Sequence, residues 1–76
     1  MEQARLIALR KYKGFTQQEI ADHLKIDVRT YINKENGSSQ FKANEMFYIA
    51  QLFQMNISEI FLPPNFMNHE VGKTTA

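Results

Sequence analysis

Two short helical patterns, separated by only three residues, limit what this chain can fold into more than any other feature of its sequence. The first pattern follows Thr16 and Glu19. These residues match a capping box, in which a hydroxyl accepts from an N–H of the first helical turn and a carboxylate accepts from the N–H of the capping residue. The pattern predicts a helix from about Gln17 to Leu24 with one apolar face.

A second helix is predicted after the break at residues 25–27. Asp27 is a favourable N-cap, because its carboxylate can accept from the free N–H groups at the positive end of a helix. We expect this helix to run to about Glu35. Asn36 and Gly37 then favour a loop, so the helix is about eight residues long.

The two segments meet the requirements of a helix-turn-helix unit. Ala21 is small enough for the helices to cross closely. Apolar residues fill the angle between them: Ile20, Leu24, Ile26 and Tyr31. With those facing inward, helical geometry turns four residues of the second helix outward: Val28, Arg29, Ile32 and Asn33. A helix presented in this way is narrow enough to enter the major groove of DNA.

Three further helices are predicted. The first covers residues 3–12 and ends before a glycine, which favours the left-handed backbone of a C-cap. The fourth covers residues 43–53 and carries a broad apolar stripe, so we expect Phe47 and Phe53 to be buried in the core. A short fifth helix at residues 57–61 follows a capping pattern and is closed by two prolines.

Composition limits the class of protein. The chain has 76 residues and no cysteine, which predicts a single small domain without disulfides and favours a cytoplasmic setting. No apolar run is long enough for a membrane span. His23 and His69 lie far apart and lack acidic partners at ligand spacing, so both are expected to face solvent and no metal site is expected. No nucleophile has a general base beside it, so neither an enzyme, a cofactor nor a small-molecule substrate is predicted.

The distribution of charge is more informative than its sum. The net charge is +1, which neither supports nor excludes a nucleic-acid partner. All but one of the Lys and Arg residues precede residue 43, whereas residues 43–62 contain only Glu45 and Glu59 as charged side chains. Any basic face therefore belongs to the first half of the chain.

The order of these features resembles the Cro and phage-repressor type of helix-turn-helix regulators, also called the XRE family. The resemblance covers residues 3–62. Its markers are TQQEIA after residue 15, the Asp27 cap, ENG at 35–37, FYIAQLF in the fourth helix and NISEIF at the end. It implies an all-α, compact, five-helix lambda-repressor-like DNA-binding domain over residues 1–62. Residues 63–76 are expected to form a loosely ordered C-terminal tail.

The resemblance implies which residues read the bases. The base-reading positions of the family are occupied here by Asp27, Val28, Arg29 and Asn33, and Ile32 lies on the same face. Arg29 suits a guanine, Asn33 an adenine or a phosphate, and Val28 a thymine methyl. An ordinary surface charge remains the alternative interpretation of Arg29.

The resemblance also implies contacts to the DNA backbone. In the family, the residue at the position of Gln17 binds a phosphate together with the N-terminal amides of its helix, as a helix N-terminus readily does. Gln18 is a further candidate, although both glutamines also suit a solvated helix face. Asn36, the amides of residues 37–40 and Lys42 would hold the backbone on the far side of the groove.

Other positions concern the scaffold. Arg10 and Glu35 resemble a buried ion pair of the family, with a role in stability. Lys25 stands where the family usually has glycine in a left-handed turn, at a cost of about 1 kcal/mol. Lys34 stands at a usually apolar position, so its stem is expected to lie along apolar surface with the ammonium in water.

These observations predict a sequence-specific DNA-binding transcriptional regulator of the Cro or repressor type, with residues 28–35 in the major groove. It is most similar to phage or mobile-element regulators. One half-site covers roughly 600–1,000 Å² of protein surface, so tight binding to double-stranded DNA predicts a homodimer. The dimer contact is expected near the fifth helix, at Phe61, Leu62, Phe66 and Met67.

A second hypothesis belongs to a different class. The same scaffold could serve an anti-repressor or modulator that binds a partner repressor protein. The low net charge and the outward Val28 and Ile32 motivate it, because exposed aliphatic side chains suit a desolvated protein interface.

Overall fold

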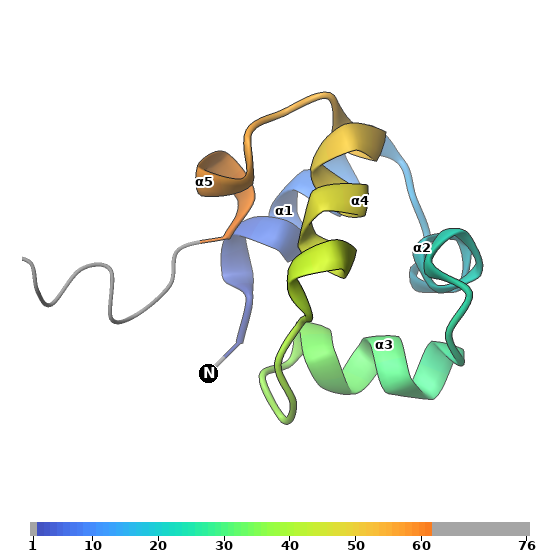
Figure 1. Cartoon of the computed structure of the whole chain (residues 1–76). Helices are drawn as coiled ribbons and strands as arrows, with labels where there is room; N and C mark the ends of the chain where they lie inside the picture. Colours follow the sequence, from blue (N-terminus) through green and yellow to red (C-terminus); the bar gives the residue numbers. More distant parts are fainter. Residues whose placement is uncertain (1, 62–76) are drawn as a thin grey trace, which may run out of the picture.

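The computed structural model describes residues 2–61, and every regular element in that range is a helix (Figure 1). The helices are α1 (Ala4–Lys13), α2 (Gln17–Leu24), α3 (Val28–Glu35), α4 (Ala43–Phe53) and α5 (Ile57–Ile60). This confirms the all-α, five-helix prediction. None of these helices has the length and apolarity needed to span a membrane. The predicted tail at 63–76 lies outside the described residues.

Local capping chemistry sets the helix ends. The Thr16 hydroxyl accepts from the Glu19 N–H at 3.0 Å, and the Glu19 carboxylate accepts from the Thr16 N–H at 2.8 Å, so the predicted capping box is present. Asp27 caps α3 by accepting from the Arg29 N–H at 2.9 Å. Gly14 ends α1 in a left-handed conformation with φ 84°.

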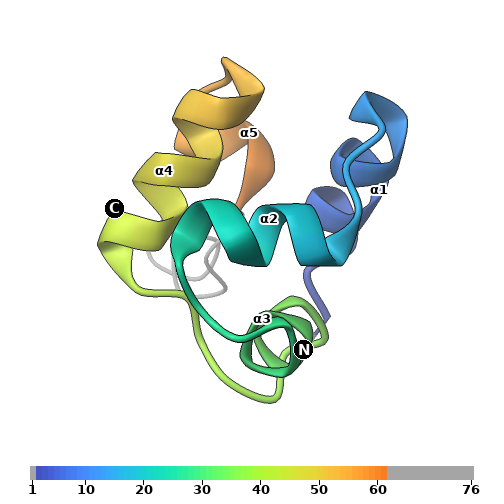
Figure 2. The same ribbon diagram turned by 90° about the vertical axis from the view of Figure 1, so that its right-hand side faces the viewer.

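The helix-turn-helix unit forms where it was predicted. In Figure 2, α2 passes across the molecule above α3, which is seen nearly end-on, so the two helices cross steeply. Ala21 and Ile20 on α2 and Tyr31 on α3 are fully buried. The absence of a larger side chain at Ala21 lets the two backbones approach, which leaves the opposite side of α3 free.

All five helices contribute to the core, which is completed by aromatic packing. Its buried members are Leu6, Ile20, Ala21, Tyr31, Phe41, Ile49, Ala50, Phe53, Ile60 and Phe61. Phe41 packs edge-on against Tyr31 and Phe61, with ring centroids 5.9 and 5.3 Å away. These contacts tie the α3–α4 loop to the rest of the fold.

The prediction for the aromatic residues of α4 was half wrong. Phe53 is buried as expected, but the Phe47 side chain is 64% exposed and Tyr48 is 44% exposed. Glu45, Ile49 and Phe53 form the buried stripe at intervals of four residues. Phe47 is two residues, roughly 200° of helix rotation, from Glu45, so it faces solvent. The apolar residues of α4 cover more of the helix than the core can bury.

The left-handed conformation of Lys25 provides a stability test. Its φ of 59° and ψ of 42° confirm the predicted turn, and a side chain is disfavoured in that region. Lys25→Gly is therefore expected to raise the free energy of unfolding by about 0.5–1 kcal/mol in urea titrations. Lys11→Gly is the matched control: it places glycine inside α1 and should lower stability by about 1 kcal/mol. A loss of stability in Lys25→Gly would contradict this account.

Candidate nucleic-acid interface

One side of α3 is free and the other is anchored. Arg29, Thr30 and Asn33 are exposed, whereas Tyr31 is fully buried and Glu35 nearly so. In Figure 1 α3 lies along the lower edge of the molecule, so its free side faces away from the other helices. Arg29 and Asn33 are therefore available to a ligand, as predicted. Thr30, which the sequence prediction omitted, lies beside them.

The apolar residues of α3 are less accessible than predicted. Val28 and Ile32 are half-buried rather than fully outward, and Val28 packs against the core. The core-facing stripe of α3 passes through Tyr31 and Glu35. Val28 and Ile32 lie at the border between this stripe and the free side of the helix, so each is partly covered. Asp27 is exposed, and its carboxylate is used to cap α3.

The side chains of the two glutamines at the start of α2 already have partners. Gln17 donates from its amide to Glu35 Oε1 at 2.8 Å, which joins α2 to the end of α3. Gln18 donates to Asp22 Oδ1 at 2.8 Å along the exposed side of α2. The first turn of α2 still presents its positive end beside α3.

The Glu35 carboxylate is the junction of α1, α2 and α3. Arg10 donates from Nε to Oε2 at 2.8 Å and from Nη2 to Oε1 at 3.3 Å, and both side chains are buried. Tyr31 donates its hydroxyl to Oε2 at 2.7 Å. Together with the bond from Gln17, these hydrogen bonds fix the orientation of α3. Sequence reasoning missed Tyr31 here, although its spacing of four from Glu35 was a usable signal.

These contacts shift two pKa values. Burial alone would raise the pKa of Glu35, but the hydrogen bonds from Arg10, Tyr31 and Gln17 and the charge of Arg10 hold it below its ordinary value. Burial, together with the bond to the Glu35 carboxylate, raises the pKa of Tyr31. The junction therefore keeps an ionised Glu35 and a neutral Tyr31 at neutral pH.

The α3–α4 loop uses most of its own amides. The N–H groups of Ser38 and Ser39 donate to the Asn33 carbonyl at 2.8 and 3.2 Å, and the Gly37 N–H donates to the Lys34 carbonyl at 3.3 Å. The Asn36 side chain accepts from the Ser38 N–H. Of the amides at 37–40 proposed for DNA contact, those of 37–39 are thus already engaged. The Lys42 side chain is exposed at the end of this loop.

The environment of Lys34 differs from the prediction. Its ammonium does not reach water: Nζ donates to Glu45 Oε1 at 2.8 Å, and the two side chains are about equally buried. Burial alone would raise the pKa of Glu45, but the bonds from Lys34 and from the Lys42 N–H lower it. The sequence prediction did not include Glu45 as the partner of Lys34, because the two residues lie in different helices and no local pattern relates them.

Two helices that cross closely at a small residue, with one polar side of the second left free, define a helix-turn-helix protein. The chain belongs to the XRE-type helix-turn-helix family: the family model described as "Helix-turn-helix domain" matches residues 4–64. Within the described residues no group of His, Cys, Asp and Glu could hold a metal ion. His23 is exposed, as predicted, and His69 lies outside the described residues.

A curated relative carries a regulatory name. The chain is 36% identical over 62 residues to a "Competence pilus inhibition repressor" of Acinetobacter baylyi. The match covers 82% of this chain and 56% of the relative, so the chain spans little more than half of that protein's length. No solved structure gives a significant match.

The lowered pKa values of Glu35 and Glu45 predict a pH dependence of stability. A carboxyl whose pKa is lower in the folded state stabilises the fold above its unfolded pKa, and this stabilisation is lost as pH falls through the folded value. The free energy of unfolding should therefore be level down to about pH 4.5, the ordinary value, and fall below it. Urea titrations at several pH values measure this. In Glu35→Gln the fall should be shallower, and stability that rises on acidification would refute the assignment.

Proposed function

We propose that this chain is a sequence-specific DNA-binding transcriptional regulator that places α3 in the major groove of double-stranded DNA. The observation that carries the proposal is the free side of α3, where Arg29, Thr30 and Asn33 project from a helix whose other side is anchored. An anchored helix can hold side chains in fixed register with base edges, so little ordering entropy is lost on binding.

Direct reading of bases is assigned to the exposed residues. Arg29 has the geometry to donate twice to a guanine, and Asn33 can pair with an adenine or bind a phosphate. Val28 and Ile32 keep a secondary role at the edge of the helix, because both are only partly exposed. Asp27 lies at the first turn and acts mainly through the cap that it forms.

Backbone contacts are assigned to the flanks of α3. The start of α2, with Gln17 and Gln18, faces one strand, and its positive end favours a phosphate. Asn36 and Lys42 flank the loop on the other side and are both exposed. We propose that the outcome of binding is repression, as the name of the relative says of that protein. A Cro-like role in a phage or mobile element and a cytoplasmic location complete the proposal.

Substitution of Arg29 tests base reading. Arg29→Ala should weaken binding to the preferred duplex by about 1–3 kcal/mol and relax selection at one base position, with an unchanged free energy of unfolding. The preferred duplex is first obtained by selection from a random library. Lys11→Ala is the control, because it removes a positive charge from an exposed position on α1. Equal affinity of Arg29→Ala and the wild type for every duplex would disprove this role.

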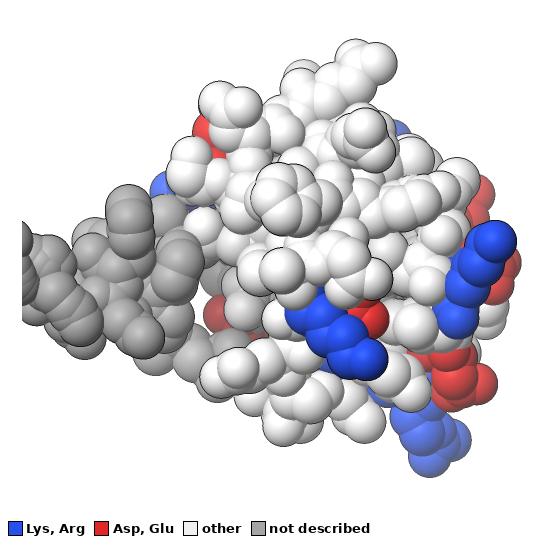
Figure 3. Space-filling view, viewed as in Figure 1, with Lys and Arg blue, Asp and Glu red and all other residues white. Residues whose placement is uncertain are grey.

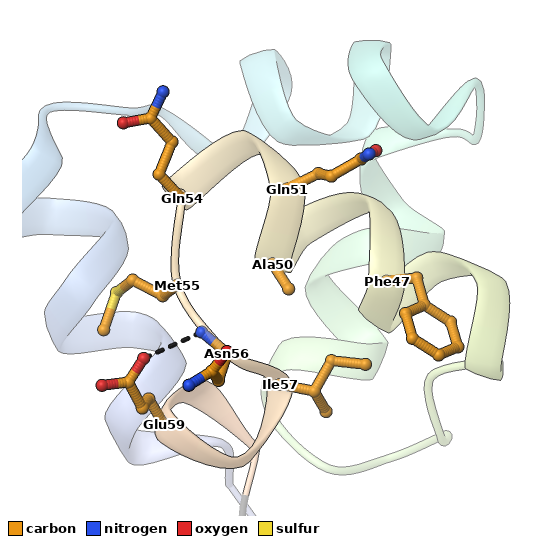
Figure 4. A pocket seen from close by; sticks show the side chains of 8 residues that line it. All are labelled: Phe47, Ala50, Gln51, Gln54, Met55, Asn56, Ile57 and Glu59. Carbon is orange, nitrogen blue, oxygen red and sulfur yellow. Dashed lines mark hydrogen bonds between the residues drawn. The ribbon is translucent and has the colours of Figure 1, made fainter.

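A single α3 covers too little DNA for tight binding, so we propose that the protein binds as a homodimer. The expected contact needs correction: Phe61 is only 3% exposed and belongs to the core, whereas Leu62, Phe66 and Met67 lie outside the described residues. Two adjacent aromatic residues, Phe47 and Tyr48, are instead exposed on α4. Beside it is an open groove of about 600 Å³ between α4 and α5 (Figure 4).

The chemistry of this α4–α5 face fits a second copy of the chain. Phe47, Gln51, Gln54 and Ile57 line the groove, and Glu59 is the one charged residue among the described residues that line it. In Figure 3 the surface over α4 is almost free of charge, while blue and red atoms gather toward α2 and α3. A two-fold contact sets each patch against itself, so an uncharged patch avoids like-charge repulsion. The face also carries little positive charge to attract DNA.

Charge insertion tests the dimer. Phe47→Glu should place two carboxylates in the contact, convert the dimer to a monomer in sedimentation experiments and weaken binding to a two-half-site duplex by more than tenfold. Tyr12→Glu is the matched control, because Tyr12 is 87% exposed on α1 and does not line the groove. A Phe47→Glu protein that remains dimeric would place the contact elsewhere.

The alternative of a protein partner on α3 has less support than the sequence indicated. Val28 packs on the core, which leaves Ile32 without a continuous apolar neighbourhood on the free side of α3. Binding measured at two salt concentrations separates the two classes, since DNA affinity falls steeply with salt and an apolar protein contact hardly changes.

A further inference from the structure

One stripe of α4 forms one side of the groove between α4 and α5. Phe47, Gln51 and Gln54 follow one another at spacings of four and three residues, which places them on the same side of the helix. Figure 4 shows Gln51 between the other two along α4, with Ile57 on the α5 side of the groove. All three residues of the stripe are exposed. The stripe therefore presents one aromatic ring followed by two uncharged amides.

The side-chain amides of this stripe suit a partner that carries amides as well. Among the residues drawn in Figure 4, the one hydrogen bond joins the Asn56 N–H to Glu59 Oε1 at 2.8 Å and involves neither Gln51 nor Gln54. A glutamine amide both donates and accepts, so two glutamine side chains can satisfy each other. Such reciprocity fits a contact between two copies of one chain.

Symmetry determines which residues of two copies can meet. In a two-fold contact, if one position of the first copy meets another position of the second copy, the reverse contact also forms. Two α4 helices packed antiparallel about an axis between positions 51 and 54 would set Gln51 of each copy opposite Gln54 of the other. The same axis would carry each Phe47 past the end of the opposite α4, toward the groove beside Ile57. The open groove of one copy would thus receive the exposed ring of the other.

The backbone at Gln54 favours glycine rather than glutamine. Gln54 ends α4 with φ 56° and ψ 47°, a left-handed conformation in which a β-carbon is disfavoured. α1 ends in the same region of conformation with Gly14. Termination of the helix therefore gives no reason for a glutamine here, whereas a contact made by its side chain does.

We propose that Gln51 and Gln54 form reciprocal amide contacts across the two-fold axis and thereby restrict this face to a second copy of the chain. A partner without matching amides would leave these groups unpaired in the contact, which lowers its affinity. The inference rests on the proposed homodimer. It adds the residues that select the partner and fix the register, as one buried polar residue does in a coiled coil.

Two double variants test the register. The like-charged variant, Gln51→Glu with Gln54→Glu, sets two carboxylates opposite each other in both contacts. Its dimer dissociation constant, measured by sedimentation, should rise by at least about a hundredfold. The opposite-charged variant, Gln51→Glu with Gln54→Lys, sets a carboxylate opposite an ammonium in both contacts, so it should remain dimeric. Circular dichroism checks that both variants are folded.

Substitution of Gln54 by glycine separates the partner contact from the stability of the fold. In the monomeric Phe47→Glu background, Gln54→Gly should raise the midpoint of urea unfolding, because it relieves the left-handed backbone. In the otherwise native chain it should nevertheless raise the dimer dissociation constant about tenfold, because each contact loses an amide. Lys25→Gly is the matched control: it gives the same relief at the end of α2, does not line the groove and should leave the dissociation constant unchanged.

The outcomes distinguish the inference from the homodimer on which it rests. An opposite-charged variant that is monomeric, or a like-charged variant that stays dimeric, would overturn the amide pairing while the homodimer stands. A Gln54→Gly dimer as tight as the Lys25→Gly dimer would overturn it as well. If the wild type is monomeric both alone and on a duplex with two half-sites, the proposed homodimer fails and the inference fails with it.

Discussion

The bonds to the Glu35 carboxylate determine how the rest of this protein is arranged. Arg10 from α1, Gln17 from α2 and Tyr31 from α3 all donate to it in a largely buried setting. A buried carboxylate is costly unless its oxygens are satisfied, so these helices are held in the one arrangement that satisfies them. The angle between α2 and α3 is thereby set by hydrogen-bond geometry as well as by apolar packing at Ala21.

Anchoring of α3 on one side is what makes its other side useful. Tyr31 and Glu35 connect it to the core and Lys34 connects it to the loop and to α4, while Arg29 and Asn33 remain exposed. The orientation of α3 and the conformation of the α3–α4 loop are therefore controlled from the same buried stripe.

The surface is divided by charge into two kinds of face. Most Lys and Arg residues lie in the first half of the chain, whereas α4 presents Phe47 and Tyr48 beside an almost uncharged groove. Under the proposed function, an anionic duplex would bind on the side of α2 and α3, and a second copy of the chain would meet α4 without like-charge repulsion.

The sequence by itself determined the helices and their ends, because a cap such as Thr16 with Glu19 or Asp27 needs only neighbours along the chain. It also indicated the free positions of α3, since one helical period separates Arg29 from Asn33. Tertiary structure alone decided the exposure of Phe47, the partner of Gln17 and the burial of Lys34. Each of these depends on which side chain from a distant helix satisfies a charge or fills the core, and no local pattern encodes that choice.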